Sequence, residues 1–318
     1  MKLLFRTIFV PFFAFLMLSA SSLTAQEWTS GNRFMIHVGA GLPVGSFGQA
    51  YNLAADYTAA LAQLQSGITT SIPAERTEIG NATLGVVGGI TDLYKITPNL
   101  SLLGTLELAY NPFNGTDISN QYTALFRDPA FLQRLGLNPS SASTTAITFD
   151  PKLSIPARAY LNTSLLLGGR YDLPLSSAFS LYASAQAGLL YSIYPEYTTN
   201  LNFAISGTIA GSTPYSVRQT LEQNSTIRSM SAAAFAYKLG VGVLVSDRIN
   251  IGVGYVAAQP QFGPSAVTAD VKTSTSVTFA GMTMTTTPFV TSQTRDISTR
   301  TNLPIGLLSV SVGYLFGQ

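Results

Sequence analysis

The chain has 318 residues, carries a formal net charge of +2, contains no cysteine, and has charged side chains at only 10% of its positions. A soluble domain has about 25% charged residues, so the composition disfavours one, and the near-neutral balance gives no indication of a nucleic-acid partner. The sequence has 27 glycines, 15 tyrosines and 18 phenylalanines, but no apolar run long enough for a helix across a bilayer. This combination favours a β-barrel in lipid, because backbone polar groups inside a bilayer must pair within the protein.

Residues 1–25 have the layout of a secretory signal peptide. Lys2 and Arg6 precede an apolar run over residues 8–18, and small residues lead up to Ala25. The run is too short for a transmembrane helix, and we expect cleavage after Ala25. Residues 26–318 then form a single outer-membrane β-barrel domain. It is formally neutral, because 2 of the 17 basic residues leave with the peptide and 15 acidic residues remain.

Alternation of apolar and polar residues marks eight strand candidates in the rest of the chain. It is clearest within residues 157–194, where Leu181 and Leu189 lie on one face of a strand and Ser184 and Gln186 lie on the other. The alternation lasts about 15 residues, which exceeds an average soluble strand and suffices for a tilted membrane-spanning strand of about 9 to 11. In chain order, the candidates are residues 33–42, 82–96, 100–110, 157–171, 179–194, 232–245, 249–257 and 303–316.

The second candidate, residues 82–96, fits the pattern least well. Its apolar face is set by Val86 and Ile90, and it also contains Asp92. A carboxylate that faces lipid is costly. A β-bulge near Thr91, or an early exit of the strand from the bilayer, would remove the conflict.

Long and short connections alternate along the chain. Bacterial outer-membrane barrels combine short periplasmic turns, long outer loops and an even number of strands. The order therefore predicts an all-β fold, a transmembrane antiparallel up-and-down β-barrel of about eight strands, with long extracellular loops and both termini in the periplasm. The long loops also contain a helical pattern over residues 50–65 and strand-like patterns over residues 201–209 and 276–284, so ten or more strands stay open as an alternative.

Residues 38–47 read Val-Gly-Ala-Gly-Leu-Pro-Val-Gly-Ser-Phe, and residues 309–316 read Ser-Val-Ser-Val-Gly-Tyr-Leu-Phe. These segments resemble the ends of small bacterial outer-membrane barrels of the OmpA and OmpX type. Gly313, Tyr314 and Phe316 are similar to the closing signal that the barrel-assembly machinery recognises, although two residues follow them. The resemblance implies a location in the bacterial outer membrane, with lipid as the surroundings and the assembly machinery as a partner during biogenesis.

Charged residues on the inward face are expected to meet in the lumen. Glu107 and Lys238 each stand about eight residues from a short turn, so they should lie at similar depth. A charge in a lumen filled by side chains must be paired, so we expect a lumen ion pair that is extended by His37 or Arg170. The functional alternative is a gate that opens a narrow pore. His37 is the only histidine, and we interpret it as a packed or hydrogen-bonded lumen residue because it lacks a convergent catalytic set.

Aromatic residues gather at strand ends, where the edges of a bilayer would lie. We interpret them as interfacial girdles. The residues concerned are Tyr110, Tyr171, Phe179, Tyr191, Tyr255, Tyr314 and Phe316. The sequence has no metal-ligand cluster, phosphate loop or redox motif, so we expect no catalytic residue, no metal and no cofactor.

Four long loops carry more chain than simple connectors need, which indicates contacts outside the cell. We expect a monomeric, non-enzymatic barrel that acts in surface contact or envelope stability, with an extracellular or envelope protein as a candidate partner. The alternatives are a small-solute or lipid channel, an accessory subunit of an envelope complex, and an outer-leaflet enzyme. The enzyme would require Asp117, Asp128, Glu196 and Asp296 to converge. A secreted soluble β-sandwich is the alternative fold.

Overall fold

The structure is a computed structural model of the chain. It describes residues 32–50, 75–77, 79–125, 127–128, 130, 144–209, 215–263, 265–279, 282–286, 289–297 and 300–317. The expected signal peptide, and nearly all of the helical pattern over residues 50–65, lie outside the described residues.

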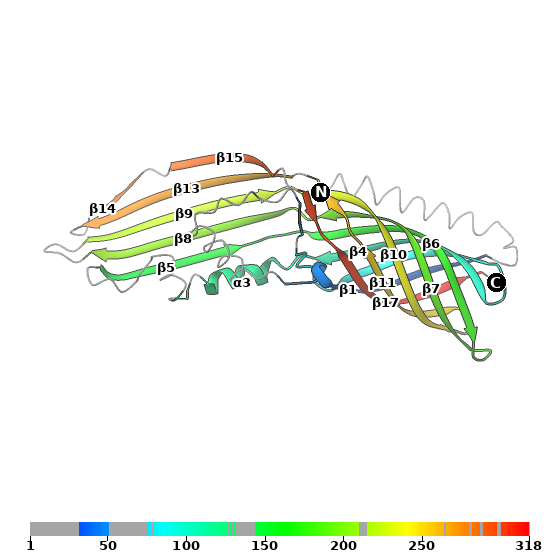
Figure 1. Ribbon diagram of the computed structural model, residues 1–318. Coiled ribbons are helices and arrows are strands. Elements are labelled where there is room, and N and C mark those ends of the chain that lie inside the picture. The colour runs from blue at the N-terminus through cyan, green and yellow to red at the C-terminus, as the bar shows by residue number, and fades with distance from the viewer. Residues whose placement is uncertain are drawn as a thin grey trace.

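Eight antiparallel strands form a closed barrel, in the order β1-β17-β11-β10-β7-β6-β4-β3 (Figure 1). The predicted fold class is therefore confirmed, and every predicted strand is present. The barrel strands are β1 (Asn32–Val44), β3 (Gly85–Lys95), β4 (Leu100–Pro112), β6 (Ala159–Pro174), β7 (Phe179–Tyr194), β10 (Met230–Val245), β11 (Ile249–Ala258) and β17 (Ile305–Phe316). Short turns connect β3 to β4, β6 to β7 and β10 to β11 at one end of the barrel, which we call the proximal end. The first strand also begins there and the last strand ends there.

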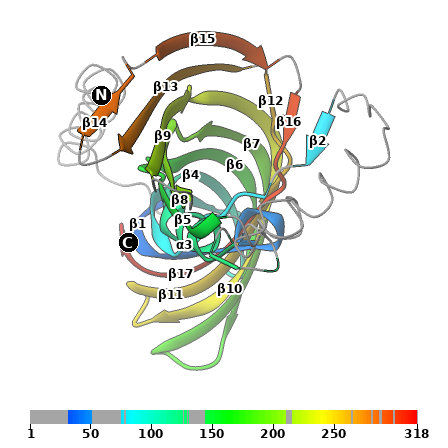
Figure 2. The same cartoon turned by 90° about the vertical axis from the view of Figure 1, so that its left-hand side faces the viewer.

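A second sheet extends from the opposite, distal end of the barrel, and we call it the distal sheet (Figure 1). Its strands follow the order β14-β13-β9-β8-β5, and β15 pairs with β13. The strands are β5 (Thr144–Ser154), β8 (Tyr197–Ile209), β9 (Tyr215–Ile227), β13 (Ser265–Phe279), β14 (Met282–Thr285) and β15 (Phe289–Ile297). Figure 2 shows this sheet from its far end, where the strands lie on an arc.

The distal sheet is built from segments that the sequence analysis treated as loops. The strand-like pattern over residues 201–209 lies within β8, and the pattern over residues 276–284 spans the end of β13 and the start of β14. These segments do not enter the barrel wall, which has eight strands. They pair instead with one another beyond the distal end.

Smaller elements complete the described chain. A three-stranded sheet has the order β12-β16-β2, formed by β12 (Gln261–Phe262), β16 (Arg300–Asn302) and β2 (Glu75–Thr77). The 3₁₀-helix η1 (Gly45–Phe47) follows β1, and helix α3 (Gly115–Leu125) contacts β5. None of the helices in the described ranges is long and apolar enough to cross a membrane.

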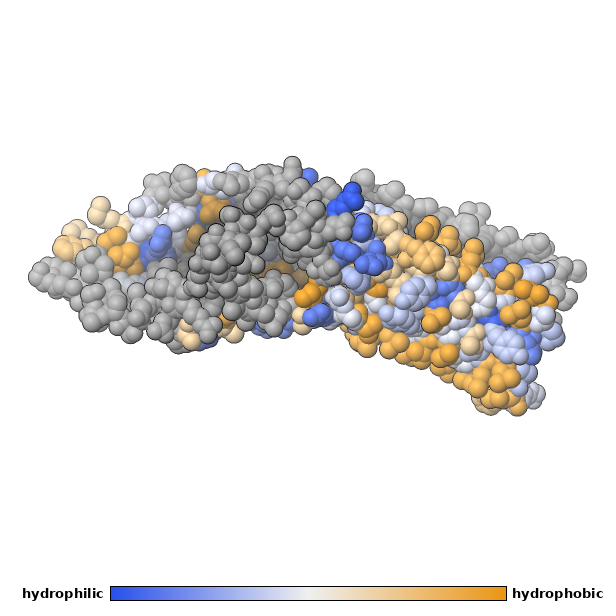
Figure 3. Space-filling model, viewed as in Figure 1, coloured by the Kyte–Doolittle hydropathy of each residue, from blue (hydrophilic) through white to orange (hydrophobic). Residues whose placement is uncertain are grey.

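The outer surface of the barrel is apolar, and Figure 3 shows apolar residues gathered over the barrel strands. Leu165 and Leu167 of β6 and Leu189 of β7 are exposed, while lumen-facing residues such as Leu166 are buried. Exposed apolar side chains on a closed barrel are stable where lipid replaces water around them. The alternation in the sequence therefore sorts side chains between lipid and lumen.

Of the two explanations given for Asp92, the β-bulge near Thr91 is wrong. Strand β3 pairs with β1 and β4 in unbroken register, so Asp92 faces outward opposite Phe34 and is exposed. It lies three residues from Lys95, where β3 ends near the proximal rim. A carboxylate close to the rim costs much less than one at the bilayer centre, which removes the need for a bulge.

Candidate functional site

Three charged or polar side chains meet in the middle of the lumen. Lys238 Nζ on β10 donates a hydrogen bond to Glu107 Oε2 on β4. His37 Nε2 on β1 lies 3.3 Å from the same carboxylate oxygen. Glu107 is 3% exposed and His37 is 5% exposed. The structure therefore brings together three of the four residues expected in the lumen cluster, and we call them the lumen triad.

Of the two residues that could extend the ion pair, His37 does so and Arg170 does not join the lumen triad. In the register of β4 and β6, Glu107 lies opposite Ser164, and Arg170 lies six residues farther toward the proximal end. Six strand residues span about 20 Å, which is too far for the guanidinium to reach the carboxylate.

Arg170 instead belongs to a second charged group nearer the proximal end. Its Nη2 lies 2.6 Å from Asp172 Oδ1, and its Nε donates to the same oxygen at 2.8 Å. The guanidinium also stacks over the ring of Tyr182, 4.0 Å from the ring centroid. The sequence analysis missed both partners. The spacing of Arg170 and Asp172 was a usable signal, because residues two apart in a strand share a face.

Buried apolar residues lie on both sides of these charged groups. The proximal layer is a buried cluster of Met35, Leu93, Leu103, Leu244 and Leu315. On the distal side, buried apolar residues that include Ala109, Leu190, Val256 and Leu307 surround Glu107 of the lumen triad. The charges are thus held between two apolar layers.

An aromatic cluster caps the distal end of the barrel, and the sequence analysis did not identify it. Phe47, Tyr160, Tyr194 and Phe262 form a chain of edge-to-face contacts, with ring centroids 5.0, 5.3 and 5.6 Å apart. The hydroxyl of Tyr160 donates to the carbonyl oxygen of Gly80 at 2.6 Å. Edge-to-face pairs of this kind add to the stability that burial provides.

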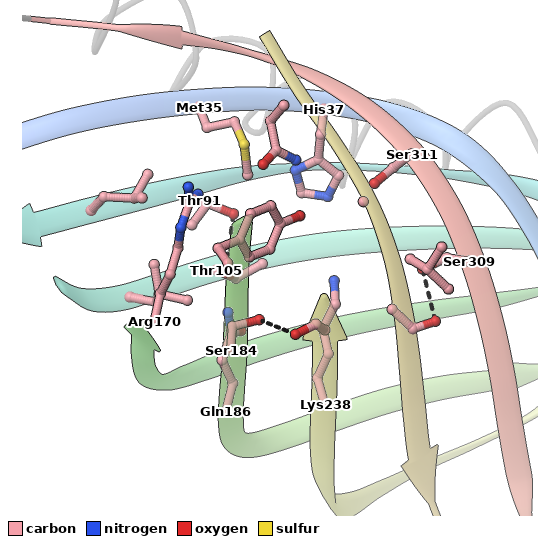
Figure 4. A pocket seen from close by; sticks show the side chains of 18 residues that line it. Met35, His37, Thr91, Thr105, Arg170, Ser184, Gln186, Lys238, Ser309 and Ser311 are labelled. Atoms are coloured by element: carbon pink, nitrogen blue, oxygen red, sulfur yellow. Dashed lines mark hydrogen bonds between the residues drawn. The ribbon is translucent and has the colours of Figure 1, made fainter. Parts of the chain in front are cut away.

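A small polar cavity lies between the lumen triad and the proximal layer (Figure 4). Its volume is about 50 Å³, and its lining includes His37, Arg170, Tyr182, Lys238 and Asn250. A cavity of this size holds a few water molecules, and its lining offers them polar partners. A larger recess of about 200 Å³ lies at the proximal mouth, lined by residues that include Arg33, Lys95, Asp172 and Asp247.

The predicted interfacial aromatics face outward at strand ends. Tyr110, Tyr171, Phe179, Tyr191, Tyr314 and Phe316 are exposed, and Tyr255 is partly buried. At the proximal end, the Phe316 ring packs against Tyr314 with a centroid distance of 4.8 Å, and the Phe34 ring is 6.4 Å away. Arg248 Nη1 donates to the Tyr314 hydroxyl at 3.2 Å.

The loop carboxylates that an outer-leaflet enzyme would need make separate local contacts. Asp117 accepts a hydrogen bond from Gln121 within α3, and Glu196 pairs with Arg158 at 3.4 Å. Asp128 is exposed beyond the end of α3 and accepts a hydrogen bond from the backbone of Ala130. The side chain of Asp296 lies outside the described residues. Within the described part of the chain, no three histidine, cysteine, aspartate or glutamate residues form a group that could hold a metal ion.

No protein-family model and no curated protein sequence matches the chain. Solved structures with a similar arrangement include the outer membrane protein OprG from Pseudomonas aeruginosa, with 9% identity, 91% of this chain and 97% of that chain covered, and a TM-score of 0.26. LpxR from Salmonella typhimurium has 9% identity over 89% and 100% of the two chains, with a TM-score of 0.19. The outer membrane protease OmpT from Escherichia coli has 8% identity over 91% and 98%, with a TM-score of 0.21.

Identities and TM-scores this low carry no inference about activity, so the chain's own geometry is the stronger guide. A closed antiparallel barrel with an apolar outer surface is the architecture of a bacterial outer-membrane protein. Within this architecture, the lumen triad and the distal sheet are the two candidate functional regions.

Proposed function

We propose that the protein is a non-enzymatic outer-membrane barrel that anchors the distal sheet outside the cell, where this sheet makes surface contacts. The barrel supplies a membrane anchor with buried apolar residues in its lumen. The observation that carries the proposal is the continuation of the β7–β10 hairpin into β8 and β9, around which the distal sheet assembles. A chain that needed only a connection between Tyr194 and Met230 would use a turn of two residues, because these residues are directly paired.

The orientation follows from the positions of the turns and termini. Bacterial outer-membrane barrels have short turns on the periplasmic side and long loops on the outer side. The proximal end, with its short turns, would then face the periplasm. The start of β1 and the end of β17 would lie on the same side. The distal sheet would stand outside the cell.

A loop replacement tests this function. Residues 195–229 are replaced by Asn-Gly, which closes β7 and β10 into a hairpin with a favoured turn. We expect the shortened protein to keep the faster gel mobility of an unboiled, folded barrel. Cells that carry it should lose the attachment or envelope resistance that the full-length protein confers. Full contact activity in the shortened protein would contradict the proposal.

Transport of a small solute or a lipid is the second candidate function. It is favoured by the polar cavity beside the lumen triad. Single-channel recording in planar bilayers separates the two functions. Steady conductance of the full-length barrel would support transport, whereas a silent bilayer that contains folded protein would support an anchoring barrel.

The accessory-subunit hypothesis is a special case of the contact function. Its prediction is that a specific envelope protein copurifies with the full-length protein and not with the shortened one.

A further inference from the structure

One face of the distal sheet carries rows of polar side chains that run across its strands. Thr198 of β8, Thr226 of β9 and Thr268 of β13 are direct neighbours in register. All three are partly buried, and the side chains of Thr198 and Thr226 lie 3.2 Å apart, hydroxyl to hydroxyl. Because residues two apart share a strand face, this row is followed by others on the same face.

The next row contains amides, a carboxylate and a hydroxyl. Asn200, Asn224, Asp270 and Ser292 are in register across β8, β9, β13 and β15. Asn224, Asp270 and Ser292 are exposed. Their polar atoms are therefore available to a ligand outside the protein.

Hydroxyl rows continue to the far end of the distal sheet. Thr220 and Ser274 are linked at 2.6 Å, Ser276 and Thr285 at 3.2 Å, and Thr278 and Thr283 at 3.0 Å. Among the described side chains of this face, Ala204 and Val290 are the apolar members. We call this surface the hydroxyl face.

The hydroxyl face carries charges of both signs, including the exposed Lys152 of β5, which lies opposite Asn202 in register. Glu222 and Lys272 are neighbours in register, and their charged atoms are 3.6 Å apart. The exposed Arg218 is offset by the exposed Asp270. The face therefore lacks the strong positive field that a nucleic acid or another polyanion would need.

The opposite face of the same strands has a different character. Val217, Leu221, Val271 and Val277 alternate with the residues of the hydroxyl face, and all four are partly buried. Gln219, Gln223 and Thr275 also lie on this opposite face, so the hydroxyl face is the more uniformly polar of the two. An apolar protein partner would find little to bury there.

We propose that the hydroxyl face binds a neutral polysaccharide. Each threonine or serine hydroxyl has one donor and two acceptor sites, and each asparagine amide has both donors and acceptors. A sugar hydroxyl has the same mixture, so the two surfaces can exchange hydrogen bonds without a charged partner. Rows repeat about every 6.8 Å along a strand and about every 4.8 Å between strands, which offers a repeating polymer many equivalent contacts.

This inference rests on the proposed surface-contact function and names the chemistry of the partner. A single hydrogen bond contributes little net free energy in water, so binding depends on many contacts made at once. A long polymer meets that requirement, and a single sugar does not. We therefore expect retention of polysaccharide and weak binding of monosaccharide.

The test uses the full-length protein folded in detergent, with cellulose, dextran and lipid-free O-polysaccharide as probes. We expect retention on at least one of these neutral polymers, with little loss when salt is raised, because no ion pair is involved. The double variant T226V/T268V should bind about tenfold more weakly, since it removes adjacent hydroxyls from the hydroxyl face and keeps the β-branched shape.

The matched control is the double variant T199V/T291V. Thr199 and Thr291 lie on the opposite face of the same sheet, on β8 and β15. This control should bind as the unaltered protein does. Equal loss of binding in both double variants would overturn the proposal, as would absence of binding to all three polymers or binding that disappears with salt.

The loop replacement and the polymer-binding test distinguish failure of the polysaccharide inference from failure of the surface-contact function. If the protein with residues 195–229 replaced loses cell attachment while the full-length protein binds none of the polymers, the contact function stands and the polysaccharide inference fails. If attachment is unaffected by the replacement, the contact function itself fails.

Discussion

Lys238 donates a hydrogen bond to Glu107 across the lumen, from β10 to β4, and two further strands, β7 and β6, stand between them in the barrel wall. The pair therefore joins parts of the wall that do not share backbone hydrogen bonds. Burying two charges is costly, and their attraction compensates only when both partners are present. The lumen triad thus favours one position of β4 relative to β10 in the closed barrel.

Removal of one charge tests this dependence. In Lys238→Met, Glu107 stays buried with only His37 beside it, and we expect the free energy of unfolding to fall by about 3–5 kcal/mol. The measurement is urea unfolding in lipid vesicles, followed by the gel mobility of the folded band. Lys95→Met is the control, because Lys95 is exposed at the end of β3 and should change stability by less than about 0.5 kcal/mol.

A double variant shows whether the loss comes from the unpaired carboxylate. Glu107→Leu combined with Lys238→Met replaces both charges by apolar groups, and such replacements are often neutral or stabilising. We expect the double variant to recover most of the stability that Lys238→Met loses. If the double variant is as unstable as Lys238→Met, the loss does not come from the unpaired carboxylate, and Lys238 stabilises the barrel mainly through its packing.

Tyr182 fills space that two glycines leave open on β10 and β11. A Cβ added at Gly252 would overlap the Tyr182 hydroxyl oxygen but stay 3.4 Å from the ring carbon that carries it. We expect Gly252→Ala to destabilise the barrel by about 1–3 kcal/mol through overpacking. Adding Tyr182→Phe removes the obstructing oxygen and should make the same alanine substitution nearly neutral, as measured by urea unfolding of the four proteins in the cycle.

Gly39 provides the comparison for this cycle. A Cβ there would overlap the backbone carbonyl oxygen of Val310, which no side-chain substitution removes. The loss caused by Gly39→Ala should therefore be the same with and without Tyr182→Phe. A rescue at both glycines would mean that Tyr182→Phe loosens the barrel generally.

The barrel strands were predictable because a single local signal determines them. Alternation sorts side chains between lipid and lumen, so the expected strand over residues 232–245 differs from β10 (Met230–Val245) by two residues at one end. The depth of Glu107 and Lys238 followed from counting residues from the turns. The same counting, applied to Arg170, would have separated it from Glu107 and paired it with Asp172.

Most of the distal sheet could not be predicted from local alternation. Strand β9 (Tyr215–Ile227) has glutamines at 219 and 223 on the face that also carries Val217 and Leu221, so its alternation is weak. Its place is set by pairing with β8 and β13, and β13 is about 50 residues away in the chain. The aromatic cluster likewise joins Phe47, Tyr160 and Phe262, whose proximity depends on the closed barrel. Local periodicity carries no information about contacts of this range.

The aromatic cluster should contribute strongly to the stability of the distal end. Tyr160 is fully buried, and its ring packs against both Phe47 and Tyr194. We expect Tyr160→Ala to lower the free energy of unfolding by about 3–5 kcal/mol, because it leaves a cavity of aromatic size. Tyr160→Phe keeps the ring and loses the hydrogen bond to Gly80, so its cost should be about 1 kcal/mol. Equal costs for the two variants would show that the hydroxyl, rather than ring packing, stabilises the cluster.

The closing strand offers a test of assembly that is separate from stability. Phe316 ends β17 on the outward face, where it contacts Tyr314 and lies near Phe34. We propose that its ring is read by the barrel-assembly machinery, so Phe316→Ala should lower the folded fraction in cells several-fold. Refolding of the purified variant into detergent should proceed nearly as well as for the unaltered protein, since an exposed ring contributes little to the folded barrel. Val310→Ala, an outward and exposed position in the middle of the same strand, is the control that should assemble normally. If Phe316→Ala impairs refolding in detergent as much as assembly in cells, the ring stabilises the barrel itself and recognition is not needed to explain the loss.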